Sequence, residues 1–115
     1  MKEYILIFRL DISNKEAQPT KEQMQQYMIQ WKQWIDSIAA INQLTEGGNH
    51  LSPSGKVVKK NGINDGIIIE NKVSVAGYIL VKANNLKEAA ELAKSCPILL
   101  AEDNSVEVRE IGSSS

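Results

Sequence analysis

Cysteine and histidine are scarce in this sequence: Cys96 and His50 are the only residues of their kind among 115. A lone cysteine excludes an intrachain disulfide and is typical of a protein from a reducing compartment. One histidine and one cysteine are also too few for a zinc site built on those ligands, and the sequence has no glycine-rich phosphate loop. We therefore predict that the protein uses no metal and no other cofactor.

An excess of charge of one sign is also absent. The formal net charge is −1 and the basic residues form no block, which argues against direct binding to nucleic acid. No apolar run is long enough to span a bilayer, and Arg9 and Asp11 fall too early for the apolar region of a signal peptide. The chain predicts one cytoplasmic domain over residues 1–111, without a membrane partner, followed by a disordered tail at 112–115.

The first half of the sequence predicts a buried strand and a long helix. Residues 3–10 are almost continuously apolar and β-rich, as expected of a strand buried on both faces. Thr20 and Gln23 have the spacing of a capping box, which satisfies free backbone N–H groups where a helix begins. An apolar stripe at helical spacing follows and predicts a helix packed on one side; it comprises Met24, Tyr27, Met28, Trp31, Trp34, Ile35 and Ile38.

The second half predicts further strands and a shorter helix. Gly47-Gly48 is expected to break the chain, and Asn61-Gly62 is a strong signal for a two-residue hairpin turn. A helix is expected to begin after the capping residue Asn85 and to end before Pro97, with Cys96 as a buried, unreactive thiol. The remaining strands are predicted at 66–70, 75–83 and 105–111.

This order of elements predicts an α+β domain, a ferredoxin-like sandwich with extra hairpin strands in its middle. Two helices can cover only one face of such a sheet. Residues 4–10 and 75–81 are nevertheless apolar on both faces, so the second face requires another cover. A second copy of the same sheet is the simplest cover, and we therefore predict a symmetric homodimer.

Segments along nearly the whole chain resemble the YCII-related superfamily, and specifically its branch named for an Asp-Gly-Pro-Phe motif. The resemblance implies a ferredoxin-like fold whose dimers bring two sheets face to face as a dimeric α+β barrel. The segments that carry it, in this order, are MKEYILIFR, MQQYMIQWKQWI, SPSGKVV, the spaced DG, E.K and GYILV, LKEAAELAKSCPIL and SVEVREI.

The motif that names the branch is altered here. Asp65-Gly66 stands where the motif begins, but Ile67-Ile68 replaces its Pro-Phe pair. Glu70 and Lys72 keep the charged positions that follow. Losing the proline frees one φ angle and restores a backbone donor, so the local turn is expected to differ from that of the family.

Three residues are candidates for acid–base catalysis. His50 has the only side chain whose ordinary pKa lies near neutrality, although a solvated loop histidine is the alternative. Asp65 and Glu70, together with Lys72, are a candidate acid–base set around a small polar substrate. The alternative is that Asp65-Gly66 forms a turn while Glu70 and Lys72 solvate a loop.

Five residues are candidates for ligand binding. An arginine on a strand that faces a dimer barrel offers a fixed donor for a carboxylate or phosphate, and an ion pair within the sheet, such as Arg109 with Glu107, is the alternative. For the aromatic candidates, packing in the core is the alternative to stacking on a ligand. The candidates are Arg9, Arg109, Trp31, Tyr78 and Lys72.

Two functions from different classes follow from these features. The first is a domain that binds a small polar or acidic metabolite near the dimer barrel, with cofactor-free proton transfer of an isomerase or lyase type. The second is a non-catalytic interaction protein linked to a sigma factor. The resemblance implies both, because some related proteins are similar to small muconolactone-isomerase-type enzymes and others are labelled transcription-initiation proteins.

Overall fold

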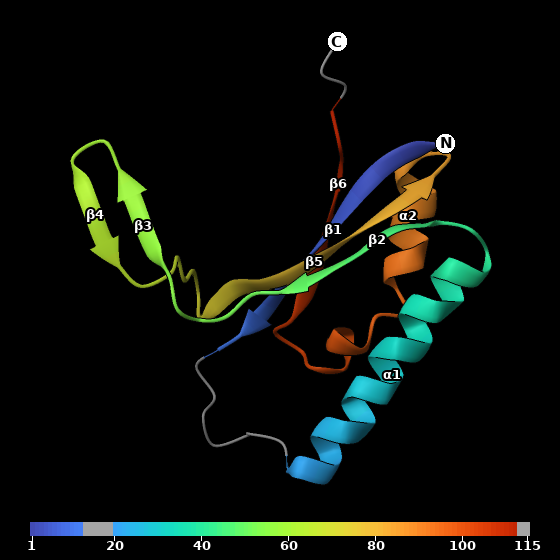
Figure 1. The fold of residues 1–115 in the computed structure, drawn as a ribbon, viewed down its shortest axis with the longest axis horizontal. Coiled ribbons are helices and arrows are strands. Elements are labelled where there is room, and N and C mark those ends of the chain that lie inside the picture. The colour runs from blue at the N-terminus through green and yellow to red at the C-terminus, as the bar shows by residue number, and fades with distance from the viewer. Residues whose placement is uncertain (13–19, 113–115) are drawn as a thin grey trace.

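The computed structural model describes residues 1–12 and 20–112 of the chain. Two helices and a four-stranded antiparallel sheet form the main body of an α+β structure (Figure 1). The predicted tail lies outside the described residues, apart from Gly112. In chain order the elements are β1 (Lys2–Asp11), α1 (Lys21–Ala40), β2 (Leu44–His50), β3 (Lys56–Lys59), β4 (Gly62–Asp65), β5 (Val73–Ala83), α2 (Leu86–Ala93), the 3-10 helix η2 (Pro97–Leu100) and β6 (Ser105–Glu110).

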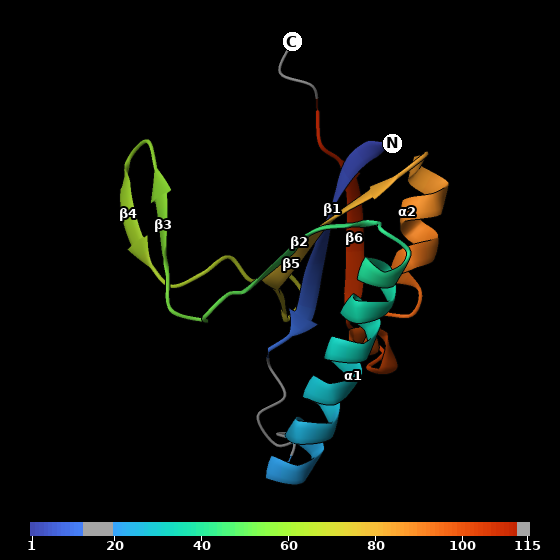
Figure 2. The same ribbon diagram turned by 45° about the vertical axis from the view of Figure 1, so that its right-hand side comes forward.

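The sheet has the strand order β2-β5-β1-β6, and each neighbouring pair is antiparallel. This order confirms the predicted α+β class and is compatible with a ferredoxin-like fold. Helices α1 and α2 lie on one face of the sheet, as Figure 2 shows. We call the other face the open face; the β3–β4 hairpin lies on its side of the molecule (Figure 2).

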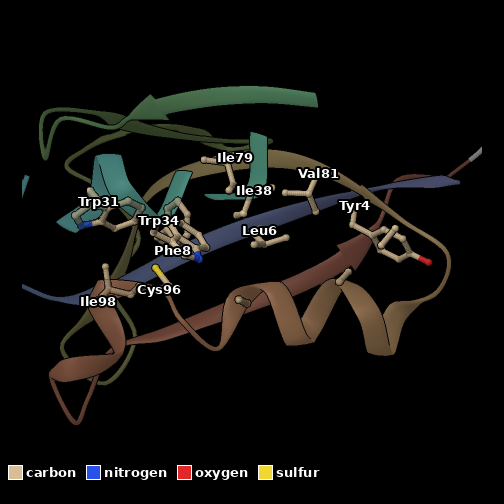
Figure 3. Close-up of a cluster of buried hydrophobic side chains, with 13 residues drawn as sticks. Tyr4, Leu6, Phe8, Trp31, Trp34, Ile38, Ile79, Val81, Cys96 and Ile98 are labelled. Atoms are coloured by element: carbon tan, nitrogen blue, oxygen red, sulfur yellow. The ribbon is translucent and has the colours of Figure 1, made fainter. Parts of the chain in front are cut away.

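The central strands β1 and β5 carry apolar side chains on both faces, as the sequence predicts. On the helix side, Tyr4, Leu6 and Phe8 are at most 3% exposed and belong to the core drawn in Figure 3. On the open face, Ile5 and Ile7 remain partly exposed. The two faces therefore differ in burial although they are similar in composition, because the helices cover only one of them.

The predicted capping box begins α1. The Thr20 side chain accepts a hydrogen bond from the Gln23 backbone N–H at 3.1 Å, and the Gln23 side chain accepts one from the Thr20 N–H at 2.9 Å. The second half of the predicted stripe is buried, with Trp34 5% exposed. Its first half is not, because Met24 and Met28 are 46% and 50% exposed. No helix in the described part of the chain has the length and apolarity needed to cross a membrane.

The end of α2 confirms the expectation for Cys96. Asn85 caps the helix by accepting a hydrogen bond from the Glu88 backbone N–H at 2.8 Å. Pro97 does not simply follow the helix: it opens η2, and Cys96 lies buried between the two. Burial raises the pKa of the Cys96 thiol to about 11, so the thiol stays protonated and unreactive at neutral pH.

The prediction that Gly47-Gly48 breaks the chain is wrong. Both glycines lie inside β2, where the pairing with β5 shifts register between Glu46 and Asn49. Gly48 has a φ of +67°, a conformation that glycine adopts without strain. The pair therefore forms an irregularity in an edge strand, which lets β2 continue along β5.

The predicted strand at 66–70 is also wrong. Only Glu70 makes a β-bridge, with Val73, through two backbone hydrogen bonds of 2.9 Å. Between them, Asn71 and Lys72 have φ values of 50° and 70°. Two central residues with positive φ are typical of a tight type I′ turn. The charged segment 70–72 is thus a turn that leads into β5.

Strands β3 and β4 form a separate two-stranded hairpin, which we call the arm (residues 56–65). The predicted hairpin is confirmed, but its two-residue turn lies one residue earlier than predicted, at Lys60-Asn61, because Gly62 is already paired with Lys59. The arm projects from the main body (Figure 1), and its Val58 and Ile63 are 73% and 64% exposed. An isolated two-stranded hairpin is only marginally stable in water. The radius of gyration of 15.6 Å exceeds the roughly 13 Å of a compact domain of this size, in line with this projecting arm.

Candidate functional site

A groove of about 590 Å³ lies between the arm and the open face of the sheet. We call it the open-face groove. Within the part of the chain that the structure describes, three charged side chains line it: Arg9 from β1, Lys56 from β3 and Glu70 from the turn before β5. Its remaining walls are mostly apolar and comprise Val57, Val58, Ile67, Ile68, Val73, Ser74 and Val75. Charged groups on an apolar wall are the usual composition of a small-molecule site.

Arg9 is held in place by Glu107 of the neighbouring strand β6. Its Nε and Nη2 atoms donate hydrogen bonds of 3.1 and 2.7 Å to the same oxygen, Oε1, of Glu107. The two side chains are 39% and 40% exposed, so water still reaches the pair. An arginine has five N–H donors, and these two bonds use two of them. The guanidinium is therefore oriented by Glu107 and keeps donors for a ligand.

Lys56 has a similar arrangement on the arm. It forms an ion pair with Asp65 across the β3–β4 hairpin, where the two residues are paired in register. Asp65 itself is almost fully exposed and does not line the groove. Asp65, predicted as a catalytic acid, is thus part of the arm, where its ion pair orients the Lys56 side chain that lines the groove.

The loop that carries Glu70 is fixed to the sheet by a residue that the sequence reasoning missed. Ser74 is 6% exposed, and its hydroxyl donates a 2.7 Å hydrogen bond to the Ile68 carbonyl. On the other side, the Gly66 backbone N–H donates to the Gly55 carbonyl at 2.9 Å. A lone serine in the otherwise apolar start of β5 was the available signal for this contact. Segment 66–70 is therefore held at Gly66 and at Ile68 without being a strand.

Three other predicted site residues lie on or near the open face without lining the groove. Arg109 is exposed on the edge strand β6, opposite Ile5. Tyr78 lies on β5, and its hydroxyl accepts a 3.3 Å hydrogen bond from the Asn49 side chain. Lys72 is an exposed residue of the type I′ turn. The predicted ion pair of Glu107 with Arg109 is replaced by the pair of Glu107 with Arg9.

His50 and Trp31 lie on the helix side of the sheet. Their rings are 5.8 Å apart between centroids, and His50 is paired with the buried Gly77 of β5. The sheet thus separates His50 from Glu70, and the structure does not bring the three predicted catalytic residues together. Among the residues that the structure describes, no group of three or more His, Cys, Asp or Glu side chains is placed to hold a metal ion.

Comparison with known proteins does not identify a family for this chain. No protein-family model matches the chain, and no curated protein matches it. The resemblance to the YCII-related superfamily therefore remains a prediction from the sequence, and the function rests on the site itself.

Proposed function

We propose that the protein is a homodimeric small-molecule-binding domain whose open-face groove takes a small acidic ligand. The observation that carries the proposal is the convergence of Arg9 and Lys56 on one groove from different sheets. A carboxylate or phosphate accepts charge-assisted hydrogen bonds from both types of side chain. The apolar wall of the groove accommodates the carbon skeleton of such a ligand.

Orientation of the cations supports binding of a compact anion. Each cation is paired with one acid, Arg9 with Glu107 and Lys56 with Asp65. These pairs are exposed and contribute little to stability, about 1 kcal/mol or less each. Their main effect is to reduce the number of conformations of two long side chains, which lowers the entropic cost of binding a ligand.

The homodimer completes this proposal. The open face exposes apolar side chains such as Val75, the arm exposes Val58 and Ile63, and the segment that follows the arm exposes Ile68. Apolar side chains exposed on a sheet and on an arm without its own core are typical of a protein–protein interface. A second copy that lies face to face across the sheet, held by the arm, covers both surfaces at once, in agreement with the barrel that the family resemblance implies.

Binding is favoured over catalysis by the position of His50. His50, the only histidine of the chain, lies across the sheet from the groove. Among the described residues, Glu70 is the one acid that lines the groove. Proton transfer in the groove would depend on Glu70 alone. A variant Glu70→Gln therefore separates the two functions, because it abolishes turnover while leaving the cationic contacts in place.

A thermal-shift screen with small carboxylic acids and phosphate esters tests the proposal. We expect at least one acid to raise the melting temperature, and Arg9→Gln or Lys56→Gln to weaken its binding about tenfold or more. Arg109→Gln is the matched control, since it removes the other arginine of the chain without touching the groove. Loss of binding in Arg109→Gln but not in Arg9→Gln, or no acid that binds, would contradict the proposed groove. Sedimentation of the same samples tests the dimer separately.

A further inference from the structure

A second cavity lies on the helix side of the sheet, between the first half of α1 and strands β1 and β5. It has a volume of about 250 Å³ and is mostly apolar, with Phe8, Met24 and Met28 among its walls. Three lining side chains also carry polar atoms: Tyr27, Trp31 and His50. It shares no lining residue with the open-face groove, because the sheet lies between them.

The indole N–H of Trp31 has no hydrogen-bond acceptor among the described residues, although Trp31 is only 5% exposed. A buried indole N–H ordinarily has an acceptor, and the other tryptophan is an example: the Trp34 indole N–H donates a 3.0 Å hydrogen bond to the Leu92 carbonyl. In Figure 3 the Trp31 nitrogen points away from the rest of the core cluster. A buried donor without an acceptor is costly, so this N–H calls for an acceptor that residues 1–12 and 20–112 do not supply.

Tyr27, which also lines the cavity, lies beside Trp31. The two rings are 6.1 Å apart between centroids. Burial raises the pKa of the Tyr27 hydroxyl, whereas the nearby Trp31 N–H acts on that pKa in the opposite direction. The two groups are thus close, but they do not meet with the geometry of a hydrogen bond. An oxygen placed in the cavity next to both groups would satisfy the indole donor.

We infer that this cavity binds a small aromatic ligand whose carbonyl or phenolic oxygen accepts a hydrogen bond from the Trp31 indole N–H. The size fits, because an apolar cavity of roughly 150 Å³ holds benzene and a volume of about 250 Å³ leaves room for a ring with a short substituent. The walls suit an aromatic ligand as well. The rings of Phe8 and Trp31 pack edge to face with centroids 4.8 Å apart, and Tyr27 packs on Trp31 in the same way. The ring of a ligand can pack against these side chains with the same edge-to-face geometry.

Two methionines supply the flexible part of the cavity wall. Met24 and Met28 lie one turn apart on α1, and both are about half exposed. Methionine side chains adapt to irregular surfaces and contact aromatic rings favourably. A ligand can therefore enter past them without displacement of the helix, and their exposed apolar surface becomes partly buried when the cavity is filled.

Nuclear magnetic resonance of the two indole N–H groups tests the inference. The full ¹⁵N-labelled protein is titrated with acetophenone, which has a carbonyl oxygen, and with ethylbenzene, which has a similar shape but no acceptor. We expect acetophenone to shift the Trp31 indole signal saturably, with a Kd of about 1 mM or below, while the Trp34 signal stays in place because its N–H is bonded to Leu92. Ethylbenzene is expected to bind about three- to tenfold more weakly and not to move the Trp31 proton downfield.

Variants sharpen the test. Trp31→Phe keeps an aromatic wall but removes the N–H, so the preference for acetophenone over ethylbenzene is expected to disappear. Met28→Ala alters the cavity wall, whereas Ile29→Ala alters an exposed neighbour outside it and serves as the control. Equal affinity for the two probes in the wild type, equal shifts of both indole signals, or no saturable shift up to about 10 mM would overturn the inference and leave water as the occupant. The wild-type comparison remains decisive even if Trp31→Phe fails to fold.

Discussion

Gly48 of β2 lies directly against the backbone carbonyl of Tyr78 in β5. A Cβ atom built on Gly48 would overlap the Tyr78 carbonyl oxygen and lie 2.6 Å from its carbonyl carbon. The neighbouring Gly47 has no heavy atom within 4 Å of an equivalent Cβ. Two adjacent glycines in one strand therefore have different structural roles, and only one of them is required for the approach of β2 to the sheet.

Gly48→Ala is expected to lower the free energy of unfolding by more than about 3 kcal/mol, because the methyl group forces β2 away from β5 and the φ of +67° strains alanine. Gly47→Ala is the matched control and is expected to change it by about 0.5 kcal/mol or less. Urea denaturation of both variants measures the difference. Equal effects of the two substitutions would mean that β2 does not pair as described.

Lys72→Gly is expected to stabilise the protein, although the sequence marks Lys72 as a candidate ligand contact. Its φ of 70° is unfavourable for lysine and free of strain for glycine, and Asn-Gly is the preferred pair in a type I′ turn. We expect a gain of about 0.5–1 kcal/mol in the free energy of unfolding. Lys59→Gly, in the regular strand β3, is the control and should destabilise by a similar amount. A loss of stability in Lys72→Gly would refute the assigned turn.

Cys96 makes stability depend on pH at the alkaline end. Its pKa is raised from 9.0 to about 11 by burial, so between these values the unfolded chain loses a proton that the folded chain keeps. This contribution to stability is fully present below pH 9 and is lost as the pH rises towards 11. Cys96→Ala is expected to remove it, so that its stability falls less steeply over this range than that of the wild type. Parallel curves for the two proteins would contradict the burial of the thiol.

Ser74→Ala is expected to loosen the segment that carries Glu70. The substitution removes the 2.7 Å hydrogen bond to the Ile68 carbonyl at little change in volume, for a loss of about 1 kcal/mol. Hydrogen exchange is the sharper measurement, because amide protons of 66–70 should exchange faster while those of β1 keep their protection. Ser37→Ala removes a hydroxyl from α1 and controls for the loss of a serine elsewhere. Unchanged exchange in 66–70 would show that the serine does not hold the loop.

The arm provides a direct test of the proposed dimer. Val58→Asp and Ile63→Asp place charges on its exposed apolar side chains and are expected to shift the protein from dimer to monomer in sedimentation equilibrium. Ile29→Asp, on the exposed surface of α1, controls for a charge introduced elsewhere and should leave the dimer intact. A wild-type protein that sediments as a monomer at micromolar concentration would reject the dimer altogether.

The features that the sequence predicts well depend on residues close to one another in the chain. The caps at Thr20 and Asn85 each bond to a backbone N–H three residues on, so their spacing alone identifies them. Local spacing does not tell which residues of the α1 stripe are buried, as Trp34 is, and which are exposed, as Met24 is. Both lie on the same stripe of α1, and only the extent of the sheet beneath the helix decides which is covered.

The errors have a common physical origin. Ile67, Ile68 and Ile69 have high β-propensity, but a strand requires a partner edge, and in this structure a serine hydroxyl takes the Ile68 carbonyl instead. The sequence does not predict the place of Lys56 in the open-face groove, for a related reason. Arg9 and Lys56 are far apart in the sequence and lie in different sheets, so no spacing links them. Asp65 and His50 have side chains suited to acid–base chemistry, but the fold places Asp65 on the exposed surface of the arm and His50 on the helix side of the sheet.

The β-bulge in the central pair of strands lies between the walls of the two proposed sites. The register of β1 with β5 shifts between Phe8 and Arg9, and these consecutive residues line the helix-side cavity and the open-face groove respectively. A single peptide bond therefore connects the walls of two sites on opposite faces of the sheet. If an occupant of one site rotates this peptide, the affinity of the other site changes, and thermodynamic reciprocity requires the same factor in return. The irregular position in an otherwise regular sheet is thus where heterotropic coupling between the two ligands would originate.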